Sequence, residues 1–274
     1  ALPAALRGSR SQQAGARGIK PVAGVEIIVA GDDVGAAGNT LVLLCRDQAG
    51  YRNLARIVTR SYVEGQGRGA PVVRRAWLAG HTAGLIALSA AVDGDVGQAL
   101  ISGNRALAES RLVEWLQLFP DRYYLELHRT GRAHEELHID GALALAQSLS
   151  VPVVATNDVR FLKADEYEAH EARVCIQQGR TLNDPRRPRD YSPEQYLKTP
   201  EQMLELFHDI PEAIENATLI AQRCTLELAL GQSHLPEFPV PEGQNQDSWL
   251  RHEAERGLER LFATPAAGLH TTDR

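Results

Sequence analysis

The sequence predicts an α/β fold, because short β-branched apolar runs alternate with stretches of helical periodicity over the first two thirds of the chain. This alternation is typical of βα units around a parallel sheet or barrel. From Asp184 onward the sequence is first rich in Pro and Arg, and only helical patterns follow. We therefore expect an αβ body followed by a helical extension.

Five segments are expected to form strands, because each is a short apolar run of the kind that a buried strand requires. In chain order they are Val22–Val29, Leu41–Cys45, Gly84–Ser89, Arg122–His128 and Val151–Thr156.

Helices are expected between these strands and throughout the extension. Asp47 and Asn104 each precede an apolar-periodic stretch and are expected to begin a helix. Two further helices are predicted over about 134–149 and from Tyr167 to Ile176, the second ending near Gly179. The helical stretches of the extension are Glu201–Phe207, Pro211–Arg223 and Ser248–Phe262.

Composition divides the chain into four segments. Residues 1–17 and 264–274 lack clear periodicity and look like disordered flanks or foreign sequence. Residues 18–183 are expected to form the αβ body, and residues 184–263 a Pro/Arg-rich linker with the helical extension. The chain starts at Ala1 without an initiator Met or a secretion signal, so it looks like a fragment.

The overall composition narrows the function classes. A hydrophobic content of 43% with 23% charged residues is that of a globular protein, and the longest apolar runs are too short to suggest a membrane role. The formal net charge of −6 means that any nucleic-acid contact must be local or lie outside this segment. Cys45, Cys175 and Cys224 each sit in an apolar run, which favours reduced core thiols in a cytoplasmic protein.

Asp158 is the sharpest candidate for chemistry. It follows the strand Val151–Thr156, and the carboxyl ends of parallel strands are where α/β barrels place ligands and catalytic groups. Since Asn157 precedes it, a turn or helix cap is the alternative interpretation.

Three other polar residues stand in predicted strands. Glu126 and His128 are two residues apart and share one face, and a carboxylate with an imidazole suits zinc or manganese. The alternative is the polar face of a half-exposed strand. Glu26 is a single acid in an otherwise apolar strand.

Two pairs of residues have the spacing of metal ligands, but no further ligands are found near either pair. The Asp93-Gly94-Asp95 segment resembles a two-metal carboxylate pair, but a helix N-cap explains either acid better. His134 and His138 have the spacing of one helix face, yet nothing nearby supplies other ligands, so we expect exposed histidines.

A small basic and aromatic patch is predicted in the linker, formed by Arg186, Arg187 and Arg189 with Tyr191. It suits contact with phosphate or with an acidic partner, and a solvated loop is the alternative.

Several strings resemble the polymerase-and-histidinol-phosphatase (PHP) region of bacterial, and specifically proteobacterial, DNA polymerase III α subunits. The similarity covers about residues 18–262. The strings that carry it include Phe119–Arg132, Val153–Phe161 and Tyr191–Tyr196.

This resemblance implies a distorted seven-stranded (β/α)7 barrel, here incomplete, which in active relatives holds metals that hydrolyse phosphoesters. It implies that Glu26, Glu126 and Asp158 stand at vestigial ligand positions. Ligating histidines are replaced, in turn, by Thr40, Thr130 and Arg160. Because a guanidinium has no lone pair to donate, Arg160 is expected to pair with Asp158 instead of binding a cation.

The expected function is therefore structural, with no catalytic residue and no metal or other cofactor in this segment. The resemblance implies a cytoplasmic parent polymerase that uses Mg²⁺ and primer-template DNA. It also implies docking of the proofreading exonuclease subunit and contact with other holoenzyme subunits. The alternatives are a metal-dependent phosphoesterase of the PHP type and a non-functional gene remnant.

Overall fold

A computed structural model describes residues 18–30, 38–66, 69–228 and 238–263. The predicted flanks 1–17 and 264–274 lie outside the described residues. The chain divides into two compact units, Ala1–Leu228 and Ala229–Arg274. Of the second unit, the structure describes one helix, α9 (Gln246–Ala263), preceded by an extended segment with a turn.

The first unit is built on one mixed sheet of six strands in the order β3-β1-β2-β4-β5-β6. The strands are β1 (Gly24–Val29), β2 (Asn39–Cys45), β3 (Val72–Val73), β4 (Leu85–Leu88), β5 (Tyr123–His128) and β6 (Val153–Thr156). β2 runs antiparallel to β1 and β4, whereas the β1–β3, β4–β5 and β5–β6 pairs are parallel. The described part of the sheet is open, as in an incomplete PHP barrel.

All five predicted strands are present, and β3 is an addition. It has two residues, which pair with Ile28 and Val29. A two-residue strand has no periodicity from which it can be predicted.

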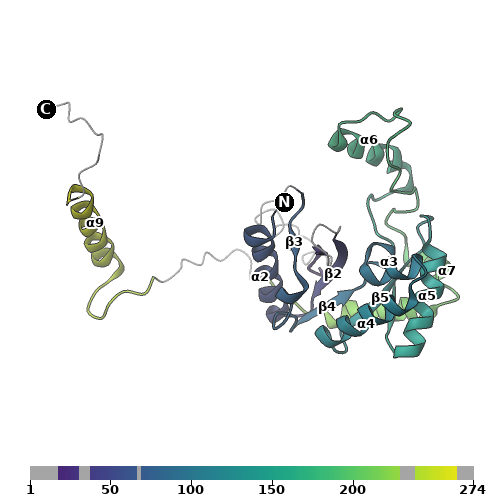
Figure 1. The fold of residues 1–274 in the computed structure, drawn as a ribbon, viewed down its shortest axis with the longest axis horizontal. Coiled ribbons are helices and arrows are strands. Elements are labelled where there is room, and N and C mark those ends of the chain that lie inside the picture. The colour runs from purple at the N-terminus through teal and green to yellow at the C-terminus, as the bar shows by residue number, and fades with distance from the viewer. Residues whose placement is uncertain (1–17, 31–37, 67–68, 229–237, 264–274) are drawn as a thin grey trace. The chain divides into compact units, whose positions relative to one another are not determined.

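Helices lie between the strands along the chain and after the last strand, as the sequence predicted (Figure 1). They are α2 (Gln48–Glu64), α3 (Asp95–Ile101), α4 (Arg105–Leu118), α5 (Glu135–Leu149), α6 (Tyr167–Gln178), α7 (Pro200–Leu206) and α8 (Pro211–Arg223), with 3-10 turns at Arg75–Trp77, Ala91–Asp93 and Ala164–Glu166. The caps are also as predicted, because Asp47 accepts a hydrogen bond from Gly50 N at 3.0 Å and Asn104 one from Leu107 N at 3.1 Å. No helix in the described part of the chain has the length and apolarity that a membrane crossing requires.

The alternation of side chains divides the core between the two faces of the sheet. Residues such as Leu43, Leu85 and Leu125 are fully buried on one face, in a cluster that draws in residues from α2 to α5. On the other face Tyr124 and Ile86 pack with Ile220 of α8. Cys45, Cys175 and Cys224 are free and buried, as expected.

Helix α8 also protects the last strand of the sheet. Asn216 donates from Nδ2 to the carbonyl oxygen of Val153 in β6 at 2.8 Å, and Ile220 packs beside Val154. An edge-strand carbonyl therefore has a partner. The compact unit extends to Leu228, so α7 and α8 belong to it, although composition suggested a boundary at 183. The division of roles at that boundary stays a prediction.

Helix α6 lies apart from the sheet, at the end of two extended connections (Figure 1). The connections are joined to each other at their base by a bridge between Phe161 and Tyr196 and by hydrogen bonds from Arg160 N to Gln195 O and from Leu197 N to Phe161 O. We call residues 159–197 the arm.

Arg129, just after β5, fastens α7 and the loop that follows it. Its guanidinium pairs with Asp209 at 2.6 Å and lies 5.2 Å from the centre of the Phe207 ring. The hydrogen bond from Arg129 lowers the pKa of Asp209 from 3.8 to about 2. Because the folded-state pKa is depressed, this stabilisation is present above about pH 4 and is lost as the pH falls toward 2.

We predict that Asp209→Asn lowers the free energy of unfolding at neutral pH by under about 1 kcal/mol, since the pair is partly exposed. The difference from the wild type should shrink as the pH falls from 6 to 3. Urea denaturation at both pH values measures it. A difference that stays constant over this range would contradict the assignment.

Candidate functional site

Polar side chains gather where the parallel strands β4, β5 and β6 end. Glu126 and His128 lie in β5, and Asp158 follows β6, so the predicted candidates meet at one edge of the sheet. The 3-10 turn after β4 brings Asp93 to the same edge, where its carboxylate binds Arg132. This arrangement follows from parallel pairing, which aligns the carboxyl ends of the strands.

Glu126 is buried, and both of its carboxylate oxygens accept hydrogen bonds. Oε2 accepts from Ala90 N at 3.0 Å, and Oε1 accepts from the Thr156 hydroxyl at 2.6 Å. Burial alone would raise the pKa of Glu126, but contact with His128 and these two donors outweighs burial and lowers it. Glu126 is therefore an ionised carboxylate held by protein donors.

His128 lies beside this carboxylate, with Nε2 at 3.4 Å from Glu126 Oε1. Neither ring nitrogen makes a hydrogen bond of good geometry with another described residue. Burial lowers the pKa of His128, but the contact with Glu126 and the charges of Glu126 and Asp158 outweigh it, so the pKa is raised. The raised pKa extends the pH range over which the ring is protonated, and a metal needs the neutral ring.

Asp158 pairs with Arg160, as the sequence predicted. Arg160 Nη2 lies 2.5 Å from Asp158 Oδ1, and Gln195 of the arm donates to Oδ2 at 2.7 Å. The Asp158 side chain is only 8% exposed. Its backbone φ of +40° is a conformation that Asp and Asn adopt more readily than most residues.

A second guanidinium, that of Arg132, links the neighbouring acids. It binds Asp93 at 2.9 Å and lies 3.9 Å from Asp158 and 3.8 Å from Glu135. Glu135 is buried and accepts hydrogen bonds from the Thr130 backbone at 2.7 Å and the Thr130 hydroxyl at 2.5 Å. The carboxylates at this edge are thus compensated by two arginines and by neutral donors.

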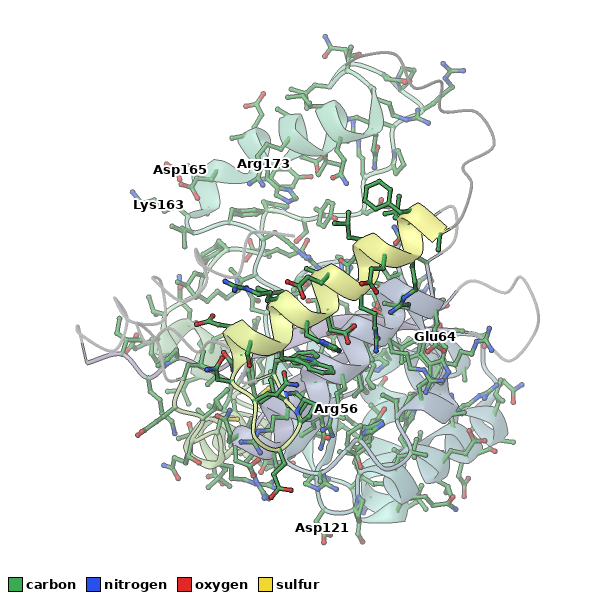
Figure 2. All side chains as sticks on the ribbon, turned by 90° about the vertical axis from the view of Figure 1, so that its left-hand side faces the viewer. Arg56, Glu64, Asp121, Lys163, Asp165 and Arg173 are labelled. Carbon is green, nitrogen blue, oxygen red and sulfur yellow. The ribbon has the colours of Figure 1, made fainter. Side chains whose placement is uncertain are left out.

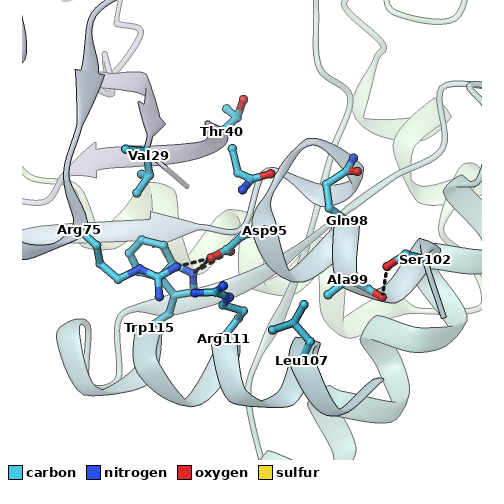
Figure 3. Close-up of a pocket in the computed structure, with 12 residues that line it drawn as sticks. Val29, Thr40, Arg75, Asp95, Gln98, Ala99, Ser102, Leu107, Arg111 and Trp115 are labelled. Atoms are coloured by element: carbon cyan, nitrogen blue, oxygen red, sulfur yellow. Dashed lines mark hydrogen bonds and ion pairs between the residues drawn. The ribbon is translucent and has the colours of Figure 1, made fainter. Parts of the chain in front are cut away.

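The expectation that Asp93 or Asp95 caps helix α3 was wrong. Gly94 occupies the N-cap position of α3, so no side chain caps this helix. Asp95 turns away from the site and binds Arg75 at 2.6 Å and the indole nitrogen of Trp115 at 2.8 Å (Figure 3).

His138 is buried, not exposed, because α5 packs that face against the sheet. Burial, with a smaller contribution from His128, lowers the pKa of His138 to about 4. His134 is exposed at the start of α5. Among the described residues, no three His, Cys, Asp or Glu side chains are grouped so that they could hold a metal ion.

Comparison with known proteins finds a matching family model and several similar proteins. Residues 9–130 match the PHP domain family. The DNA polymerase III subunit alpha of Pseudomonas aeruginosa is 50% identical over 242 residues, which are 88% of this chain and 21% of the relative. That of Escherichia coli strain K12 is 44% identical over 246 residues, which are 90% of the chain and 21% of the relative.

The chain therefore matches the PHP region of the DNA polymerase III α subunit. The counterpart from Xylella fastidiosa (strain Temecula1) agrees, with 45% identity over 252 residues. The chain spans about a fifth of the length of these relatives.

Two of the positions that the resemblance marks as vestigial ligands lie away from Asp158. Glu26 is exposed on β1, three strand spacings from β5, or about 14 Å along a sheet. Thr40, on β2, lines a hollow of about 320 Å³ with Arg75, Asp95 and Trp115 (Figure 3). No hydrogen bond or ion pair among the described residues joins Glu26 or Thr40 to Asp158.

The arginine patch of the arm is not uniform. Arg187 is directed at the buried Glu171 and pairs with it, and Arg186 is exposed, 3.7 Å from Asp184. Arg189 is exposed. Contact of these residues with phosphate or a partner stays a prediction.

Sequence reasoning missed Arg132 and Gln195 as members of the site. Both stand within the strings that carry the family resemblance, which is the signal that marked their segments. Their spacing, however, does not indicate that they meet Asp158, because Gln195 is 37 residues away along the chain.

We predict that Arg160→Gln destabilises the chain by about 2 kcal/mol, because it leaves a buried carboxylate without its nearest cation. Asp158→Asn is the matched partner, since Asn tolerates the same backbone conformation. In a double-mutant cycle by urea denaturation, the double variant should lose less than the sum of the single losses. Additive losses would show that the two groups do not interact.

Proposed function

We propose that this chain is a non-catalytic, structural PHP domain of a replicative DNA polymerase, the DNA polymerase III α subunit, and that it holds no catalytic metal. The observation that carries the proposal is the pairing of Asp158 with Arg160 at the strand ends. A cation at Asp158 would have to displace a guanidinium that already neutralises it. The identity to α subunits supports the parentage.

The other groups at this edge support the same role. Glu126 is occupied by Ala90, Thr156 and His128. Glu135 is bound to Thr130, which stands where the resemblance expects a ligating histidine. Carboxylates that could otherwise ligate a metal therefore connect strands, helix α5 and the arm.

We propose further that the parent protein adds deoxynucleotides to a primer with Mg²⁺, and that its catalytic carboxylates lie outside this segment. Asp95 of the Asp93-Gly94-Asp95 segment is bound to Arg75 and Trp115, which supports this placement. In the parent, this domain would serve as a docking platform for the proofreading exonuclease subunit in the cytoplasm.

The rival function is a metal-dependent phosphoesterase, for which Glu126, His128 and Asp158 at one sheet edge are the favouring observation. We expect purified chain to retain far less than one zinc or manganese ion per molecule and to leave a phosphodiester substrate intact. Stoichiometric metal with hydrolysis that disappears in Glu126→Gln would overturn the structural role.

Docking is tested with the proofreading exonuclease subunit of the same replication system. We expect the chain to form a complex with it in size-exclusion chromatography, and to unfold cooperatively on its own. A cooperative chain that binds no exonuclease would contradict the docking role. A chain without a cooperative transition would favour a gene remnant.

A further inference from the structure

Helix α2 carries a row of arginines on its exposed side. Arg52, Arg56 and Arg60 follow one another at four-residue intervals, which places them about 6 Å apart along one side of a helix. No acidic residue lies between Asp47 and Glu64. Arg56 and Glu64 are labelled in Figure 2.

The charges of Arg52 and Arg56 are not neutralised within the described part of the chain. Arg52 and Arg56 are exposed and make no hydrogen bond or ion pair with another described residue. Most other described arginines, such as Arg132 and Arg160, are bound to carboxylates or carbonyls.

The far end of the row is fixed by an aromatic ring. The Arg60 guanidinium lies 4.5 Å from the centre of the Trp77 ring and also pairs with Glu64 at 3.0 Å. Arg74, just after β3, lies 5.4 Å from the same ring. The shared Trp77 therefore brings a fourth cation beside Arg60.

Two tyrosines lie along one edge of the exposed side of α2, with Arg60 at the opposite edge. Tyr51 is 40% exposed and Tyr62 is 50% exposed. They are eleven residues apart, which is close to three helical turns, so they lie along the same edge of α2. At 100° per residue, the small side chains of Ala55 and Thr59 fall between this edge and the arginines. We call this face of α2, with Arg74, the basic-aromatic face.

We infer that the basic-aromatic face binds a single-stranded nucleic acid. The arginines contact successive phosphates, since guanidinium groups suit phosphate oxygens. The tyrosines stack on bases, which are accessible in a single strand and covered in a duplex. On a chain with a net charge of −6, such binding is confined to this local patch. The inference goes beyond the structural role and does not depend on the metal-free site.

The test measures fluorescence anisotropy of a labelled single-stranded oligonucleotide with the full chain over a range of salt. Arg52→Gln with Arg56→Gln removes two cations from exposed helix positions. Affinity falls with salt, and the slope of log affinity against log salt should become shallower by about 1.4, which is 0.7 for each lost phosphate contact.

A second variant separates stacking from charge. Tyr51→Ala with Tyr62→Ala should weaken single-strand binding at least about five-fold at fixed salt and leave the salt slope unchanged. The affinity for a duplex of the same sequence should change little.

The matched control is Arg105→Gln with Arg173→Gln, which removes two exposed arginines on α4 and α6 that likewise make no hydrogen bond or ion pair among the described residues (Arg173 in Figure 2). It should bind as the wild type does. Equal loss in the control, no measurable binding, or no effect of the tyrosine variant would each overturn the inference. If the tyrosine variant has no effect and an acidic peptide competes with the oligonucleotide for the chain, the face would be assigned to an acidic protein partner.

Discussion

The need to compensate buried carboxylates at the ends of parallel strands governs this structure. Glu126, Glu135 and Asp158 all lie where strands β5 and β6 converge, and an isolated buried charge would cost several kcal/mol. In an active PHP site metal ions would supply the compensating charge. Here Arg160 and Arg132 supply it, and backbone and hydroxyl donors satisfy the remaining oxygens.

The same compensation fastens the arm to the sheet. Gln195 reaches Asp158, Ser192 donates to the carbonyl of Thr130, and Asn157 donates to the carbonyls of Glu194 and Tyr196 at 3.0 and 2.7 Å. Each of these contacts joins a segment after β5 or β6 to the base of the arm. The polar groups at these strand ends thus form a joint between two parts of one domain.

The sequence predicted those features that depend on local pattern. Strands such as Val153–Thr156, the caps Asp47 and Asn104, and the pair Asp158–Arg160 follow from residues that are close along the chain. Its failures concern partners that are distant along the chain. Asp95 was expected to cap α3, but Trp115 and Arg75, each 20 residues away, bind its carboxylate. The burial of His138 depends on the packing of α5, which spacing alone does not reveal.

The same distinction separates structural from functional arginines. The Pro/Arg-rich segment attracted attention because its arginines are adjacent in sequence, yet Arg187 is neutralised by Glu171, 16 residues earlier. Arg52 and Arg56 are separated by three residues and are inconspicuous in the sequence, but the fold leaves both unpaired on one side of α2. A cation that is already paired must break that pair to bind phosphate, whereas an unpaired one loses only water and counterions. The pairing state, which only the fold reveals, is therefore the ground on which Arg52 and Arg56 are preferred to Arg187 for nucleic-acid contact.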